Sequence, residues 1–167
     1  MKKIFLLVTV TVFSITLACA QVTWVNYKID NRISVKLPAQ PQDVGNSTTL
    51  VKDKDSIIYL TILIDFQKVA QADSATLAPY LPTQDFANGL KTGMLSKMPG
   101  STLGEVKIDK WKGYYAYHVD GENAEKKLKL YTYMVVMGSK MYGLMVIAGS
   151  DKSTKGKDDF FDSLALN

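Results

Sequence analysis

Alternating apolar and polar residues predict several short β-strands in the first half of the chain. Residues 23–29 and 33–37 alternate in this way and are separated by Asp30-Asn31, a pair typical of turns. A third strand is predicted at residues 47–51, after a loop that contains two prolines. Residues 57–66 are the most apolar segment, and both of their alternating faces carry hydrophobic side chains. We therefore expect this last strand to be central in a sheet and covered on both sides.

The hydrophobic period changes from two to about four residues in the middle of the chain. Residues 67–84 form a long connection with two prolines, and Thr83 or Asp85 can cap the helix that follows it. This predicted helix ends before Pro99, and its apolar anchors are Phe86, Leu90 and Met94.

Two glycines, Gly89 and Gly93, lie four residues apart within this predicted helix. In a membrane such spacing permits two helices to pair, but the polar neighbours of these glycines exclude a membrane span. Each glycine also weakens an α-helix by about 1 kcal/mol relative to alanine. We interpret the pair as a place where the helix backbone packs close to a sheet.

The second half of the chain returns to strand patterns. Four strands are predicted, at residues 103–110, 114–119, 126–137 and 141–147. The last two are joined by a hairpin at Gly138-Ser139, and a short helix follows at residues 155–166. The order of strands, helix, strands and helix favours an α+β fold. In this fold an antiparallel sheet is flanked by the mid-chain helix and the C-terminal helix.

Three of these features together resemble the PsbP-like α/β/α sandwich superfamily. They are the strand Ile33-Ser-Val-Lys-Leu-Pro38, the long mid-chain helix and the terminal sequence Asp159-Phe-Phe-Asp-Ser-Leu164. The resemblance covers residues 24–166 and implies helices on both sides of an antiparallel sheet. Members include extrinsic photosystem subunits and many small exported bacterial proteins. In the plant members the fold serves as a docking module rather than an enzyme, and no ligand residue of theirs is carried over to this chain.

The first twenty residues have the pattern of an export signal. Lys2 and Lys3 precede an apolar stretch at residues 4–17, and Ala18-Cys19-Ala20 supplies the small residues of a cleavage site. The stretch is shorter than the roughly 18 residues of a membrane span and carries four hydroxyl side chains. We predict a signal peptide at residues 1–20, followed by a single α+β domain at residues 21–167 that is periplasmic or extracellular.

The position of Cys19 is compatible with two kinds of export signal, one cleaved after Ala20 and one lipidated at the cysteine. Cleavage after Ala20 would release a soluble domain without cysteine, which suits an oxidising compartment. Alternatively, Cys19 could be acylated, and the domain would then be a lipid-anchored scaffold subunit of the envelope. Thr16 and Leu17 fit poorly to the residues that usually precede a lipoprotein cysteine, so we favour cleavage after Ala20. Contact with the membrane is expected only if Cys19 is lipidated.

Composition narrows the classes of function. The chain of 167 residues, 47% hydrophobic and 22% charged, has the size and composition of one globular domain. A lone cysteine excludes a disulfide framework, and a lone histidine excludes a multi-histidine metal site. Without residues 1–20 the formal charge falls from +4 to +2, and Arg32 is the only arginine, so nucleic acid is not an expected partner. No cofactor motif occurs in the sequence, and no cofactor is expected.

His118 is the only side chain whose ordinary pKa lies near neutrality. On an alternating strand it shares a face with Asp120, about 7 Å further along, so the carboxylate could orient it as a general base. This pair carries the alternative hypothesis of an envelope hydrolase or lyase. No serine elbow or phosphate-binding loop accompanies the pair. Because Gly121 follows directly, a position at a strand end beside a turn explains His118 more simply.

Tyrosines crowd the predicted strands of the second half. Tyr114, Tyr131 and Tyr133 are candidate contacts for a ligand, because tyrosine offers apolar area with a polar tip. The same region holds methionines, which can repack around a ligand, at Met134, Met137, Met141 and Met145. The favoured hypothesis is an exported, non-enzymatic binding or docking domain that uses this aromatic surface for a protein or small-molecule partner. The simpler alternative is that tyrosines are good strand formers.

Overall fold

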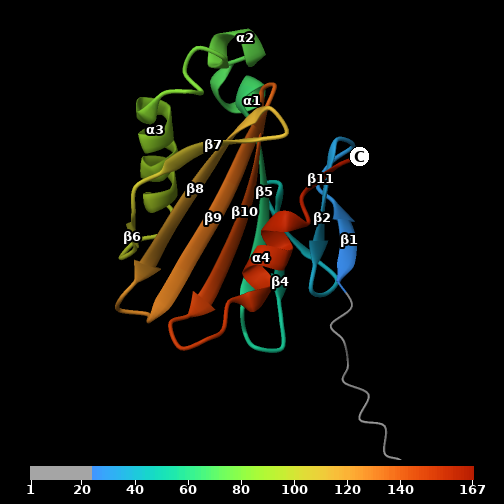
Figure 1. Ribbon diagram of the computed structural model, residues 1–167, viewed down its shortest axis with the longest axis vertical. Helices are drawn as coiled ribbons and strands as arrows, with labels where there is room; N and C mark the ends of the chain where they lie inside the picture. Colours follow the sequence, from blue (N-terminus) through green and yellow to red (C-terminus); the bar gives the residue numbers. More distant parts are fainter. Residues whose placement is uncertain (1–23) are drawn as a thin grey trace, which may run out of the picture.

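One large antiparallel sheet organises the computed structural model, which describes residues 24–167 (Figure 1). Its strands follow the order β3-β4-β5-β10-β9-β8-β6, and β7 pairs with β8 beside β6. Their bounds are β3 (Gln42–Gly45), β4 (Thr48–Lys52), β5 (Ile58–Asp65), β6 (Thr102–Leu103), β7 (Lys107–Trp111), β8 (Tyr114–Asn123), β9 (Leu128–Met137) and β10 (Lys140–Gly149). The signal peptide and Cys19 predicted from the sequence lie outside the described residues.

A second sheet of three strands packs beside the large one, and four helices complete the described chain. The small sheet has the order β1-β2-β11, with β1 (Val25–Lys28), β2 (Ile33–Leu37) and β11 (Ala165–Leu166). The helices are α1 (Phe66–Ala70), α2 (Ser74–Leu77), α3 (Gln84–Leu95) and α4 (Lys155–Asp162). Within residues 24–167, none of these helices has the length and apolar character needed to cross a membrane.

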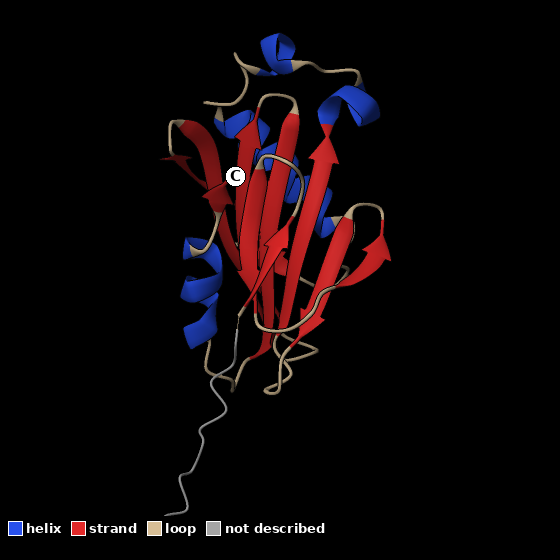
Figure 2. Cartoon of the chain, turned by 90° about the vertical axis from the view of Figure 1, so that its right-hand side faces the viewer, coloured by secondary structure: helices blue, strands red, loops and turns tan. Residues whose placement is uncertain are grey.

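The large sheet is covered on both faces, so the molecule has three layers (Figures 1 and 2). Helix α3 lies on one face, capped at its start by the Thr83 side chain, which accepts a hydrogen bond from the Phe86 N–H. Helix α4 and the small sheet lie on the other face. Two hydrophobic cores result, one under α3 and one under α4. This arrangement confirms the predicted α+β fold.

The core under α4 depends on close aromatic packing. Phe160 is fully buried and packs edge-on against Tyr59, with ring centroids 5.4 Å apart. Gly156, one turn earlier on α4, lies so close to the same ring that an added Cβ would come within 2.7 Å of the Tyr59 hydroxyl oxygen. The absence of a side chain at residue 156 therefore lets α4 settle onto the sheet.

Several predicted elements differ in detail from the observed ones. The hairpin at Gly138-Ser139 is confirmed, because β9 and β10 pair from Lys140 opposite Met137. The connection at residues 67–84 contains α2 and most of α1. The helix predicted for residues 155–166 ends at Asp162, and the last residues form β11, which pairs with β2. The backbone after Asp162 satisfies its hydrogen bonds in this small sheet instead of in a longer helix.

Strand β5 is central, as predicted, but its two faces are not both fully covered. Tyr59 and Thr61 are buried under the α4 layer. The opposite face carries Leu60, Ile62 and Ile64, which remain partly exposed. Helix α3 leaves this part of the sheet incompletely covered, and a pocket lies there.

Candidate ligand-binding pocket

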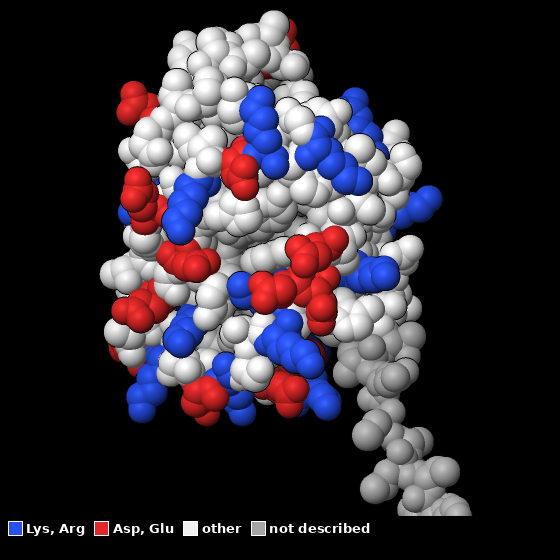
Figure 3. All heavy atoms as spheres, viewed as in Figure 1, with Lys and Arg blue, Asp and Glu red and all other residues white. Residues whose placement is uncertain are grey.

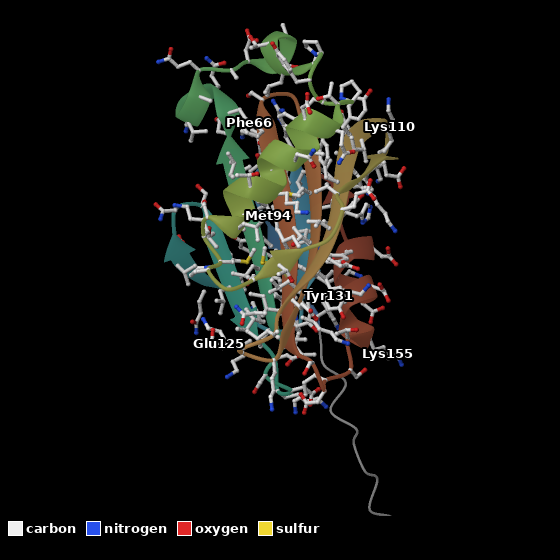
Figure 4. The ribbon with its side chains drawn as sticks, turned by 90° about the vertical axis from the view of Figure 1, so that its left-hand side faces the viewer. Phe66, Met94, Lys110, Glu125, Tyr131 and Lys155 are labelled. Carbon is white, nitrogen blue, oxygen red and sulfur yellow. The ribbon has the colours of Figure 1, made fainter. Side chains whose placement is uncertain are left out.

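A pocket of about 780 Å³ lies between α3 and the face of the sheet formed by β5, β9 and β10. This volume falls within the range of roughly 300–1,000 Å³ that is usual for small-molecule sites. Figure 4 shows α3 crossing this face of the sheet, with Phe66 at the upper edge and Met94 on the helix. Both of these residues line the pocket.

The walls of the pocket are mostly aliphatic. Strand β5 contributes Leu60, Ile62 and Ile64, whose alternate positions place them on one face. Five methionines line the pocket as well: Met94, Met98, Met134, Met141 and Met145. Because methionine is unbranched and flexible, these side chains can repack around a ligand of irregular shape.

The interpretation of Gly89 and Gly93 as points of close packing against the sheet was wrong. A Cβ added at either position would meet nothing within 4 Å, and both glycines line the pocket. The helix packs against the sheet through larger apolar side chains instead, such as Phe86 and Met94. The two glycines thus keep one wall of the pocket open.

Thr132 is the unusual residue of the pocket floor. It lies in the middle of β9, opposite Val119 on β8 and Met145 on β10, and it is only 4% exposed. Its hydroxyl group is buried and has no hydrogen-bond partner among the described residues. A buried hydroxyl without a partner costs about 1–3 kcal/mol, so this position in the pocket floor is one that the described residues alone leave unsatisfied.

Part of the pocket lining could be predicted from the sequence, because several methionines had been identified as side chains that can repack around a ligand. Three of the four noted in the sequence, Met134, Met141 and Met145, line the pocket, whereas Met137 faces the core under α4. The signal that could have located the pocket is the pair Gly89 and Gly93, since small residues in an amphipathic helix leave space as readily as they allow close contact.

His118 and Asp120 lie on the opposite face of the sheet from the pocket, on the side that carries α4. Both are exposed, and no hydrogen bond joins them among the described residues. The His118 ring stacks on the Tyr133 ring at 4.3 Å between centroids. Partial burial lowers the pKa of His118 below 6.5, against the opposing effect of the Asp109 and Asp120 carboxylates.

The three candidate tyrosines share this face but differ in accessibility. Tyr133 is 7% exposed and packs toward Phe161, and its burial raises the pKa of its hydroxyl to about 12. Tyr114 is 36% exposed, and Tyr131 is partly exposed beneath the Lys157 ammonium, which lies 5.1 Å from its ring centroid. Tyr133 therefore belongs to the core under α4, and only Tyr114 and Tyr131 present surface to a partner.

Asp120 and Tyr131 come together at a second, more open depression of about 460 Å³ near β6. Acidic and basic side chains are interspersed over this face of the molecule (Figure 3). Within residues 24–167, no group of three or more His, Cys, Asp or Glu side chains is placed to hold a metal ion. The face around His118 is thus a surface of mixed charge, on which Asp109, Asp120, Lys107 and Lys157 all act on the imidazole.

Similarity to solved structures identifies the fold. Cyanobacterial PsbP from Synechocystis sp. PCC 6803 matches with a TM-score of 0.62 at 11% identity, over 90% of this chain and 96% of that chain. The chain therefore has the PsbP-like fold that its sequence resembles. No protein-family model matches the chain, and no curated protein matches its sequence.

Two further structures are similar at lower scores. Protein PA94 of unknown function from Pseudomonas aeruginosa has a TM-score of 0.44 at 15% identity, over 75% of this chain and 83% of that one. A protein of Bacteroides thetaiotaomicron has a TM-score of 0.41 at 9% identity, over 81% of this chain and 45% of that one.

Proposed function

We propose that this protein is an exported, non-enzymatic binding domain that holds a small amphipathic molecule between α3 and the sheet. The observation that supports this function is an apolar pocket of about 780 Å³ whose floor contains the buried, unpartnered hydroxyl of Thr132. Apolar walls with a few polar groups are typical of small-molecule sites, in which the polar groups fix the orientation of the ligand.

The chemistry of the lining favours binding over catalysis. General acid–base catalysis needs a titratable group close to the reacting atoms. Among the described residues that line the pocket, Lys97 alone carries an ionisable side chain. The His118–Asp120 pair lies across the sheet from the pocket and cannot act on a molecule bound there.

Binding can be tested with N-phenyl-1-naphthylamine, an uncharged dye whose fluorescence rises in apolar surroundings. The wild-type domain should bind it, and Gly93→Leu should abolish binding by filling the space beside α3. Thr92→Leu is the matched control, because it adds an apolar side chain to an exposed position on the same helix. Equal dye binding by both variants would refute the pocket as the binding site.

Export can be tested by the intact mass of the protein recovered from its own cells. A mature chain that begins at Gln21 is expected, with no cysteine. A chain that begins at an acylated Cys19 would instead identify the lipid-anchored form. Recovery of the full chain from Met1 would contradict export.

A further inference from the structure

The pocket is long and aliphatic rather than compact and aromatic. Residues Met141, Gly143, Met145 and Ile147 of β10 all line it, so the lined part of this strand extends about 20 Å. Phe66 is the only aromatic side chain in its described lining. A site of this shape suits a flexible hydrocarbon chain, because each of its methylene groups is stabilised by leaving water.

The charge of the lining is positive. Lys97 follows the end of α3, is exposed at the mouth and has no acidic partner within salt-bridge distance among the described residues. The other polar residues at the mouth, Asn46 and Thr48, are neutral. No acidic side chain of the described residues lines the pocket, so the local field favours an anion over a cation.

The floor of the pocket contains a second polar group, besides Lys97, that a ligand would have to match. The Thr132 hydroxyl has no partner among the described residues and almost no accessible surface, so a ligand oxygen would pair with it only once the flexible methionine side chains around it move aside. A plain hydrocarbon would leave this hydroxyl unpaired, whereas an ester carbonyl or a glycerol hydroxyl beside an acyl chain would pair with it.

From these three features, and on the basis of the proposed function, we infer that the ligand is an anionic monoacyl lipid. The acyl chain lies along the methionines and β5, the acidic head is attracted to Lys97, and an oxygen of the linkage accepts from Thr132. Aliphatic walls, a single cationic group and a buried donor together fit this class, whereas a neutral sterol would leave Lys97 without an anion and a flat aromatic hydrocarbon would use only the walls.

The test compares two lipids with the same acyl chain and glycerol linkage, of which only one carries an anionic phosphate. Oleoyl lysophosphatidate and monooleoylglycerol, both below their micellar concentrations, are titrated against dye-loaded protein, and displacement of N-phenyl-1-naphthylamine is measured. The anionic lipid should displace the dye at about fivefold lower concentration, the size expected of one ion pair at a surface. This preference should shrink when the salt concentration rises.

Three variants test which side chains cause the preference for the anionic lipid and which contribute to the binding of both lipids. Lys97→Gln should remove the preference for the anionic lipid, whereas Lys91→Gln, which removes the same charge from α3 outside the lining, should keep it. Thr132→Val should weaken the binding of both lipids and leave dye binding unchanged.

Two outcomes overturn the inference in distinguishable ways. If the dye binds and Gly93→Leu blocks it, but both lipids displace it equally, the lipid class is wrong and the proposed function stands. If neither the dye nor the lipids bind, the proposed function itself fails.

Discussion

Asp30 joins the small sheet to the large one. Its carboxylate accepts hydrogen bonds from the Lys140 ammonium at 2.9 Å and from the Tyr142 hydroxyl at 2.8 Å, both on β10. It also accepts from the backbone N–H groups of Arg32 and Ile33 in the turn before β2. Burial alone would raise the pKa of Asp30, but these donors outweigh it and hold the pKa below 3.8.

Asp30→Asn should therefore destabilise the protein at neutral pH by about 1.5–3 kcal/mol, the range for hydrogen bonds to a charged group. Because the folded pKa lies below the unfolded one, the carboxylate stabilises the fold above pH 3.8, and this contribution is lost as the pH falls through the folded value. In urea unfolding, the unfolding free energy of the wild type should exceed that of the variant at pH 7, and this difference should disappear at acidic pH.

Asp158→Asn is the matched control for this experiment. Asp158 also pairs with a lysine, Lys157, at 2.8 Å, but its side chain is 71% exposed. Such surface pairs contribute little, so this variant should unfold like the wild type at both pH values. A pH-independent gap for Asp30→Asn would contradict the role given to its charge.

Two glycines of this molecule lie in opposite surroundings. Gly121 is in tight contact with a neighbouring strand, whereas Gly93 borders open space. A Cβ at Gly121 would overlap the carbonyl oxygen of Thr102 and the side chain of Leu103 on β6. Gly121→Ala should cost about 1–3 kcal/mol of unfolding free energy through overpacking. Gly93→Ala should instead add up to about 1 kcal/mol, because alanine favours the helix and meets no neighbour. Opposite signs in urea unfolding are expected, and equal losses would refute the open space beside α3.

The position of a single side chain could be predicted from the sequence only where the local alternation of residues determines which face of the sheet it occupies. The alternation along residues 128–137 correctly grouped Thr132 with Leu130 and Met134 on one face. That its hydroxyl lacks a partner depends on Val119 and Met145, which reach it from two other strands. Tyr133 is likewise buried by Phe161 of α4, a contact that no spacing within β9 reveals.

Among the elements, α4 depends most on a single side chain. Phe160 is fully buried between Tyr59 and Phe161, whereas Phe161 itself is partly exposed. Phe160→Ala should lower the unfolding free energy by about 3–5 kcal/mol, and Phe161→Ala by clearly less. Thermal unfolding followed by circular dichroism measures both, and a larger loss for Phe161→Ala would contradict the packing described for α4.

The sequence predicted the long elements and the alternating strands β1, β2 and β4 well, but it missed the two shortest helices. Strands β5, β9 and β10 and helix α3 have sustained periodicity, so their existence and type were clear. Helices α1 and α2 are only five and four residues long, too short for a helical period to show. They are instead fixed by Asp65 and Asp73, whose side chains cap their first turns.

At the scale of the whole molecule, the order of strands was enough to predict an antiparallel α+β fold, but not the pocket. The pocket exists because α3 covers the large sheet incompletely and leaves one face of β5 partly open. That offset is set by packing between elements far apart in the chain, such as Phe86 of α3 against Tyr117 of β8. The residues that line the pocket therefore could not be assembled from sequence spacing alone.

Methyl NMR of the methionines during titration with oleoyl lysophosphatidate tests most directly whether a molecule binds between α3 and the sheet. Residues 24–167 carry an internal control, because Met137 is buried in the core under α4 while the other five methionines of this range line the pocket. We predict that the methyl signals of those five shift saturably and that the signal of Met137 stays in place. No shift at all, or an equal shift of Met137, would contradict a binding site between α3 and the sheet.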